Sequence, residues 1–158
     1  MQTSITYLRM SRQREDTVPH PKKRLVLADD HIELLGTIEQ LLCAHFDVVG
    51  TAVDGLTLVM LTEALRPDVV VTDIRMPGLS GIDAARRILQ QKVCEAIVLL
   101  TVYDDLRLVR SALEAGIRGY VLKASAGEEL IPAIEEALQG RVFVSRHVRP
   151  SSHKTKRV

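Results

Sequence analysis

Residues 69–78 read VVVTDIRMPG, and the rest of the chain is organised around this stretch. Its three consecutive valines predict a strand that is buried on both faces, because a half-exposed strand alternates apolar with polar residues. The proline and glycine at the end of the stretch turn the chain toward a helix that begins near Gly81. Asp73 is therefore expected at the carboxyl end of a buried strand, which is the edge where open α/β sheets bind ligands.

Apolar runs and amphipathic segments alternate along the rest of the chain. Strands are expected at residues 25–28, 47–53, 69–72, 96–101 and 120–122, and helices at residues 34–42, 56–65, 81–91, 105–115 and in a last segment that ends at Leu138. Parallel neighbours need helical crossovers, so this order predicts an α/β protein with a doubly wound parallel sheet and helices on both faces. Pro132 conflicts with a long last helix and predicts either a start near Glu129 or a kink.

Composition and charge are those of an ordinary globular chain. Of 158 residues, 46% are hydrophobic and 26% are charged, which predicts one domain with tails. We expect a flexible N-terminal extension at residues 1–23, the domain at 24–140 and a basic C-terminal linker or tail at 141–158. A net charge of +1 and 3% aromatic residues give no global case for nucleic-acid binding. The isolated cysteines and the absence of a long apolar run predict a cytoplasmic protein with no membrane partner.

Acidic side chains follow two of the expected strands. Asp29 and Asp30 come directly after residues 25–28, and Asp73 comes after the valine strand. A single aspartate at a strand end often only caps the following loop, but two neighbouring strands would bring three carboxylates to one edge. Such a group repels itself unless a cation lies among the oxygens, and hard oxygen ligands of this kind suit Mg2+ or Mn2+.

Two further strands end in polar residues of other kinds. Thr101 supplies a hydroxyl group and Lys123 supplies an ammonium group. Taken alone, a threonine is usually a strand former and a lysine is usually a solvated surface charge. Together with the acidic groups, they predict a site that handles an anion around a cation.

The chain resembles the receiver domain of two-component response regulators over residues 24–140. The match rests on Asp29-Asp30, the stretch from Asp73 to Gly81, Leu100-Thr101, and Gly119-Tyr120 followed by Lys123. The resemblance implies a flavodoxin-like (CheY-like) sheet of five parallel strands in the order 2-1-3-4-5. Residues 123–125, Lys-Ala-Ser, are similar to the LuxR/NarL-type subfamily, which carries a C-terminal helix-turn-helix domain. The residues after 140 are too few for that domain, so a truncated regulator and a stand-alone receiver both stay open.

The resemblance also implies how the acidic residues act. Asp73 would be the phosphoacceptor that takes a phosphoryl group from the phosphohistidine of a cognate sensor histidine kinase. Asp30 and Asp73 would bind Mg2+ directly, together with the backbone carbonyl of Arg75. Asp29 would act mainly through water. A carboxylate can attack an anionic phosphoryl group only if a metal and an ammonium group offset the charge.

The remaining implied roles concern charge and switching. Lys123 would pair with the phosphoryl group as a point charge, and Thr101 would donate a hydrogen bond to it. Tyr120 resembles the family's switch aromatic, which swings inward as Thr101 moves; otherwise it is a half-buried strand tyrosine with a hydrated hydroxyl. The output is expected to be transcription regulation in a full-length protein, with a homodimer after phosphorylation and DNA contacts only through the missing domain.

Three alternatives compete with a phosphorylated receiver. A phosphohydrolase of the haloacid dehalogenase kind needs a second carboxylate two residues after its nucleophile, and neither acidic site has that spacing. A nucleotide or flavin binder needs a phosphate-binding glycine loop, but the chain has no GxGxxG or GxxxxGK motif. A receiver that acts without phosphorylation, through protein contacts alone, is disfavoured by the complete acidic cluster. The chain is thus expected to be a phosphorelay acceptor rather than an enzyme.

Overall fold

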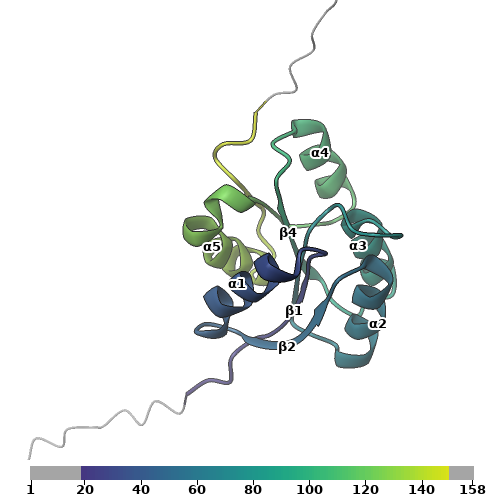
Figure 1. Cartoon of the computed structure of the whole chain (residues 1–158), viewed down its shortest axis with the longest axis vertical. Coiled ribbons are helices and arrows are strands. Elements are labelled where there is room, and N and C mark those ends of the chain that lie inside the picture. Colours follow the sequence, from purple (N-terminus) through teal and green to yellow (C-terminus); the bar gives the residue numbers. More distant parts are fainter. Residues whose placement is uncertain (1–18, 150–158) are drawn as a thin grey trace, which may run out of the picture.

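A computed structural model describes residues 19–149, and a parallel sheet forms the centre of this part of the chain (Figure 1). Its strands lie in the order β2-β1-β3-β4-β5-β6. They are β1 (Arg24–Ala28), β2 (Asp47–Ala52), β3 (Val69–Thr72), β4 (Ala96–Thr101), β5 (Gly119–Leu122) and β6 (Phe143–Val144). The predicted order of the first five strands is confirmed. The number of strands was underestimated, because β6 is only two residues long and pairs with β5 at the sheet edge.

Five α-helices cover the two faces of this sheet within residues 19–149. They are α1 (Ile32–Cys43), α2 (Gly55–Leu65), α3 (Gly81–Gln90), α4 (Leu106–Glu114) and α5 (Ala126–Leu138), and a 3-10 turn (Lys123–Ser125) precedes α5. One core cluster joins the sheet to α1 and α5, and the other joins it to α2, α3 and α4. Figure 1 shows α1 and α5 together, apart from α2 and α3. The predicted doubly wound architecture is therefore confirmed.

The central strand β3 is buried along its whole length, as its sequence predicts. Val70 packs in the cluster on one face, and Val69 and Val71 pack in the cluster on the other. The paired strands on both sides, β1 and β4, satisfy its backbone. A polar residue can therefore appear only where this strand ends, which places Asp73 at the edge of the sheet.

The helix ends follow from local signals in the sequence. Ser80 caps α3 by accepting a hydrogen bond from the Asp83 amide (3.1 Å), and His31 caps α1 through Nδ1. Gly116, with a φ of 95°, ends the segment after α4 in the left-handed conformation that glycine favours. These ends confirm the predicted helix positions to within a few residues.

Pro132 lies inside α5, which begins at Ala126, so the predicted start near Glu129 is wrong. The proline removes the amide that would pair with the carbonyl of Glu128. Both residues are exposed. Water can therefore satisfy that carbonyl, and the buried face of the helix retains its packing. The alternative prediction, a kink, stays a prediction.

The segments that flank the domain, residues 19–23 and 141–149, differ in how they pack. Residues 19–23 are exposed and form no helix or strand, whereas residues 141–149 run along the sheet, with Ser145 buried. Part of the expected C-terminal tail is thus packed on the domain. The rest of both expected tails, residues 1–18 and 150–158, lies outside the described residues. None of the described helices has both the length and the apolar composition needed to cross a membrane.

The two cysteines are free and differ in burial, which gives a direct prediction. Cys43 is exposed, whereas Cys94 is buried and burial raises the pKa of its thiol from 9.0 to about 11. At neutral pH, we expect an alkylating reagent to label Cys43 at least about a hundredfold faster than Cys94, because the thiolate is the reactive form. The free energy of unfolding should fall as pH rises from 9.0 to about 11, because only the unfolded chain releases the Cys94 proton in that window. Mass spectrometry of the native protein measures the labelling rate of each thiol. Equal rates for Cys43 and Cys94 would contradict the burial of Cys94.

Candidate functional site

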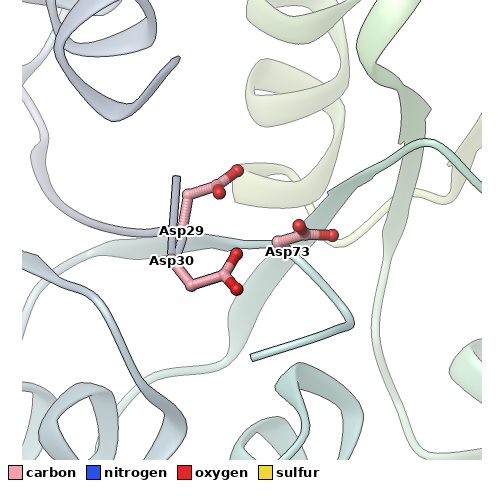
Figure 2. A group of neighbouring side chains, drawn as sticks. All are labelled: Asp29, Asp30 and Asp73. Carbon is pink, nitrogen blue, oxygen red and sulfur yellow. The ribbon is translucent and has the colours of Figure 1, made fainter. Parts of the chain in front are cut away.

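Three carboxylates meet at the carboxyl edge of the sheet. Asp29 and Asp30 follow β1, and Asp73 follows β3 (Figure 2). One oxygen from each residue lies within 4.8 Å of the others. Asp29 and Asp73 are buried, whereas Asp30 is exposed. The structure therefore brings together all three acidic residues that the sequence singled out.

Strand pairing determines the position of these carboxylates along the sheet edge. β1 and β3 are parallel neighbours in which Ala28 pairs with Thr72, so both strands end side by side. The amide of Asp73 donates to the carbonyl of Ala28 (3.0 Å). The amide of Asp29 donates to the carbonyl of Ala52 in β2 (3.1 Å). Backbone hydrogen bonds thus fix the positions of the main chain from which these acidic side chains extend.

Local hydrogen bonds orient the two buried carboxylates. Oδ1 of Asp73 accepts a hydrogen bond from the amide of Ile74 (2.7 Å), and Oδ1 of Asp29 accepts one from the amide of His31 (2.8 Å). In both residues the other oxygen, Oδ2, faces Lys123. Each carboxylate is therefore held in one orientation by its own loop.

Lys123 joins the two buried carboxylates from the end of β5. Its Nζ lies 2.7 Å from Oδ2 of Asp29 and 2.8 Å from Oδ2 of Asp73, and its side chain is only 14% exposed. Burial by itself lowers the pKa of Lys123, but the hydrogen bonds and charges of both aspartates outweigh burial and raise the pKa. The lysine therefore holds a proton and a positive charge between two strand ends.

The donor set of this cluster fits a small divalent cation. Counted as ionised, three carboxylates against one ammonium group leave two negative charges at the edge. Their oxygens are hard ligands that lie close enough to share one ion. The predicted backbone ligand, the carbonyl of Arg75, belongs to the loop after β3, and its part in metal binding stays a prediction. The Arg75 guanidinium lies 5.5 Å from the centre of the Tyr103 ring.

Thr101 and Tyr120 lie beside the acidic cluster on β4 and β5, and a loop residue links them. Thr101 is buried, and its hydroxyl oxygen accepts a hydrogen bond from the amide of Tyr103 (3.4 Å). The Tyr120 hydroxyl donates to the carbonyl of Tyr103 (2.7 Å). Tyr120 is fully buried rather than half-buried with a hydrated hydroxyl. Burial, followed by the charges of nearby aspartates, raises its pKa.

The sequence did not predict that Tyr103 links Thr101 to Tyr120, because its contribution to this link is a backbone amide and carbonyl. Such groups are present in every residue, so the sequence carries no direct signal for them. Its position two residues after Thr101, in the loop that leaves β4, is the only signal that could have indicated it.

The Tyr120 hydroxyl should stabilise the fold through this single bond. We expect Tyr120→Phe to lower the free energy of unfolding by about 1 kcal/mol, as the loss of one buried hydrogen bond does. The matched control is Tyr103→Phe, which keeps the accepting carbonyl and for which we expect a change within about 0.5 kcal/mol. Urea unfolding measures both variants, and equal stability of Tyr120→Phe and the unmodified chain would contradict this role.

Residues 25–135 match the family model of the response regulator receiver domain. The chain belongs to this family. The transcriptional regulatory protein PdtaR of Mycobacterium tuberculosis is 36% identical over 118 residues, which cover 75% of this chain and 57% of that protein. The probable transcriptional regulatory protein NarL of the same organism is 34% identical over 130 residues, which cover 80% of this chain and 60% of that protein.

Solved structures place the receiver in the same family. The signal receiver domain of NarL from Mycobacterium tuberculosis aligns with a TM-score of 0.73 at 31% identity, covering 77% of this chain and 100% of that one. A two-component response regulator of the LuxR family from Aurantimonas aligns with a TM-score of 0.76 at 34% identity, covering 80% and 92%. The predicted receiver identity and its NarL/LuxR-type relatives are thus confirmed. The receiver spans just over half the length of the curated relatives named above.

Proposed function

We propose that this receiver accepts a phosphoryl group on Asp73 from the phosphohistidine of a sensor histidine kinase, in the presence of Mg2+. One observation carries the proposal: Asp73 shares a buried ammonium group with Asp29, and an oxygen of a third carboxylate, Asp30, lies within 4.8 Å of an oxygen from each of them. An acceptor carboxylate needs positive charge beside it, because the incoming phosphoryl group is itself an anion.

The transfer exchanges one bond for another. A carboxylate oxygen of Asp73 forms a bond to phosphorus while the bond from phosphorus to the imidazole nitrogen breaks, and that nitrogen keeps the electron pair and takes up a proton. Lys123 stays charged and offsets the negative charge of the transferred oxygens. The Thr101 hydroxyl donates a hydrogen bond to a phosphoryl oxygen once the group is in place.

The acidic residues would hold the metal ion. Asp30 and Asp73 supply carboxylate oxygens, Asp29 acts mainly through water, and the carbonyl of Arg75 is a further proposed ligand. Mg2+ suits this oxygen set, and Mn2+ is the alternative. When bound, the ion supplies positive charge that neutralises phosphoryl oxygens. The receiver is thereby a phosphorelay acceptor with only self-phosphorylation and dephosphorylation chemistry, not an enzyme with its own substrate.

The output is proposed to be control of transcription in the cytoplasm by a longer protein. The relatives PdtaR and NarL are transcriptional regulators by name, and one structural neighbour is a pair of RcsB dimers bound to DNA, with a TM-score of 0.72 at 28% identity. Phosphorylation would then act through Tyr120 and promote a homodimer. A stand-alone receiver that acts through protein contacts is the alternative.

Labelling of the full chain tests the proposal. The protein is incubated with Mg2+ and a small-molecule phosphodonor, and intact mass is followed for the unmodified chain, Asp73→Asn and Asp47→Asn. Asp47 is the matched control, since it is exposed at the opposite, amino-terminal end of β2. We expect one phosphoryl group on the unmodified chain and on Asp47→Asn, none on Asp73→Asn, and none when a chelator removes Mg2+. Equal labelling of Asp73→Asn would refute the assignment.

A further inference from the structure

Residues 143–149, which we call the strap, run from β5 to the loop between β4 and α4. The inner end of the strap pairs with β5, where the amide of Phe143 donates to the carbonyl of Arg118 (2.8 Å). The amide of Ser145 donates to the carbonyl of Tyr120 (2.8 Å). The strap is thus bonded directly to the backbone of the tyrosine that the proposed switch uses.

Buried side chains hold the inner end firmly. The hydroxyl group of Ser145 accepts a hydrogen bond from the amide of Leu122 (3.0 Å) and donates one to the carboxylate of Glu129 in α5. Ser145 and Glu129 are both buried, at 4% and 9% exposure. Hydrogen bonds to a buried carboxylate are costly to break, because the carboxylate would remain without a partner.

The outer end of the strap is held much more weakly. The amide of Arg149 donates to the carbonyl of Asp104 (3.1 Å), and the carbonyl of Arg149 accepts from the amide of Leu106 (3.3 Å). The ion pair between Arg149 and Asp104 is long (3.9 Å), and its side chains are 83% and 56% exposed. Such a pair contributes little. The outer contact, which we call the clasp, consists of these two backbone hydrogen bonds, and the half-buried Val148 packs against the core beside it.

The clasp also satisfies the first amide of α4. Leu106 is the first residue of this helix, where amides have no partner within the helix. The carbonyl of Arg149 supplies that partner. Protection of the Leu106 amide from exchange thus depends on whether the clasp is closed.

The clasp and the acidic site share one short loop. The amide of Tyr103 donates to the Thr101 hydroxyl, the carbonyl of Tyr103 accepts from the Tyr120 hydroxyl, and the carbonyl of the next residue, Asp104, forms the clasp. When the Thr101 hydroxyl moves toward a phosphoryl group on Asp73, its bond to the Tyr103 amide is lost. Tyr103 and Asp104 are consecutive residues of one short loop, so a displacement of the loop at Tyr103 would shift the Asp104 carbonyl relative to Arg149.

We infer that the strap is the output element of this receiver: phosphorylation of Asp73 opens the clasp at Arg149, while the inner end at Ser145 stays bound to β5 and α5. The inference rests on the proposed function and adds the element that carries its signal. Residues 146–149 are then held against the β4–α4 loop in one state and attached only through residues 143–145 in the other.

Two variants of the full chain test the clasp without phosphorylation. Arg149→Pro removes the amide that donates to Asp104, whereas the matched control Arg149→Ala keeps both backbone bonds and removes only the ion pair. We expect the Leu106 amide to exchange about tenfold faster in Arg149→Pro, as the loss of a hydrogen bond gives, and at an unchanged rate in Arg149→Ala. Equal exchange in the two variants, measured by NMR, would overturn the clasp.

Phosphorylation is the second arm of the experiment. The unmodified chain is treated with Mg2+ and a small-molecule phosphodonor, and intact mass is recorded beside amide exchange. A mass gain with about tenfold faster exchange at Leu106 and Arg149, and with Ser145 still protected, supports the inference. A mass gain with unchanged exchange at Leu106, or with equal loss at Ser145, overturns the inference alone. No mass gain overturns the proposed function and the inference together.

Discussion

Lys123→Met should lower the free energy of unfolding by about 3 kcal/mol in the absence of divalent ions, because removing one partner of a buried ion pair leaves uncompensated charge. The ammonium group lies within 2.8 Å of both buried carboxylates, so the variant leaves Asp29 and Asp73 facing each other. Added Mg2+ should restore part of the loss, since a divalent ion replaces the missing charge. Urea unfolding with and without Mg2+ measures both effects.

The pH dependence of this loss follows from the raised pKa of Lys123. A group whose pKa is higher in the folded than in the unfolded chain stabilises the fold below its unfolded pKa, 10.5 for this lysine. That contribution disappears as pH rises through 10.5 and then through the folded pKa. The difference in stability between the unmodified chain and Lys123→Met should therefore shrink in this alkaline range.

Lys23→Met is the matched control for this substitution. Lys23 is exposed at the amino-terminal end of the sheet, just before β1. We expect a change within about 0.5 kcal/mol for this variant, with no dependence on Mg2+. Equal stability of Lys123→Met and Lys23→Met would show that the folded protein does not need Lys123 to offset the charge of the buried carboxylates.

Gly81→Ala is expected to cost about 3 kcal/mol or more, because a new side chain would force the backbone apart in a packed region. A Cβ atom at Gly81 would overlap the backbone carbonyl oxygen of Asp73. The Gly81 amide also donates to the carbonyl of Ile74 (2.7 Å), which holds the loop against the end of β3. The variant should therefore displace the acceptor residue itself, and we expect phosphoryl labelling of the folded fraction to fall with stability.

Gly36→Ala is the matched control in α1. Beyond the adjacent residues and the backbone of its own helix, no atom lies within 4 Å of the position that a Cβ would take at Gly36, and the residue is exposed. Alanine favours a helix over glycine, so this variant should gain about 0.5–1 kcal/mol and label normally. Thermal unfolding and intact mass measure the pair. Normal stability and labelling of Gly81→Ala would show that the loop after β3 is free to move away from Asp73.

Most of the fold could be predicted because its four inner strands, β1, β3, β4 and β5, are buried on both faces. Runs such as residues 69–71 and 96–100 have no polar residue, and each ends where a polar group is needed at the sheet edge. The acidic site followed from the same rule, since the carboxyl ends of parallel strands meet. The contacts that hold the acidic side chains in place could not be predicted from the same rule. That Lys123 joins Asp29 to Asp73 depends on side-chain directions that spacing does not specify.

The missed features involve backbone bonds between distant segments. β6 is only two residues long, and the clasp joins Arg149 to residues more than forty positions earlier through amides and carbonyls. Neither leaves a periodic pattern. The start of α5 was misplaced because a proline is penalised within a helix, whereas the exposed position of Pro132 relieves that penalty through water.

Locating the phosphoryl group on the chain tests whether Asp73 is the acceptor. After labelling with the phosphodonor and Mg2+, borohydride reduces an aspartyl phosphate to homoserine, and peptide mass spectrometry identifies the altered position. We expect homoserine at residue 73 and at no other aspartate. Homoserine at residue 29 or 30, or a phosphoryl group that stays on a hydroxyl or imidazole side chain, would contradict it.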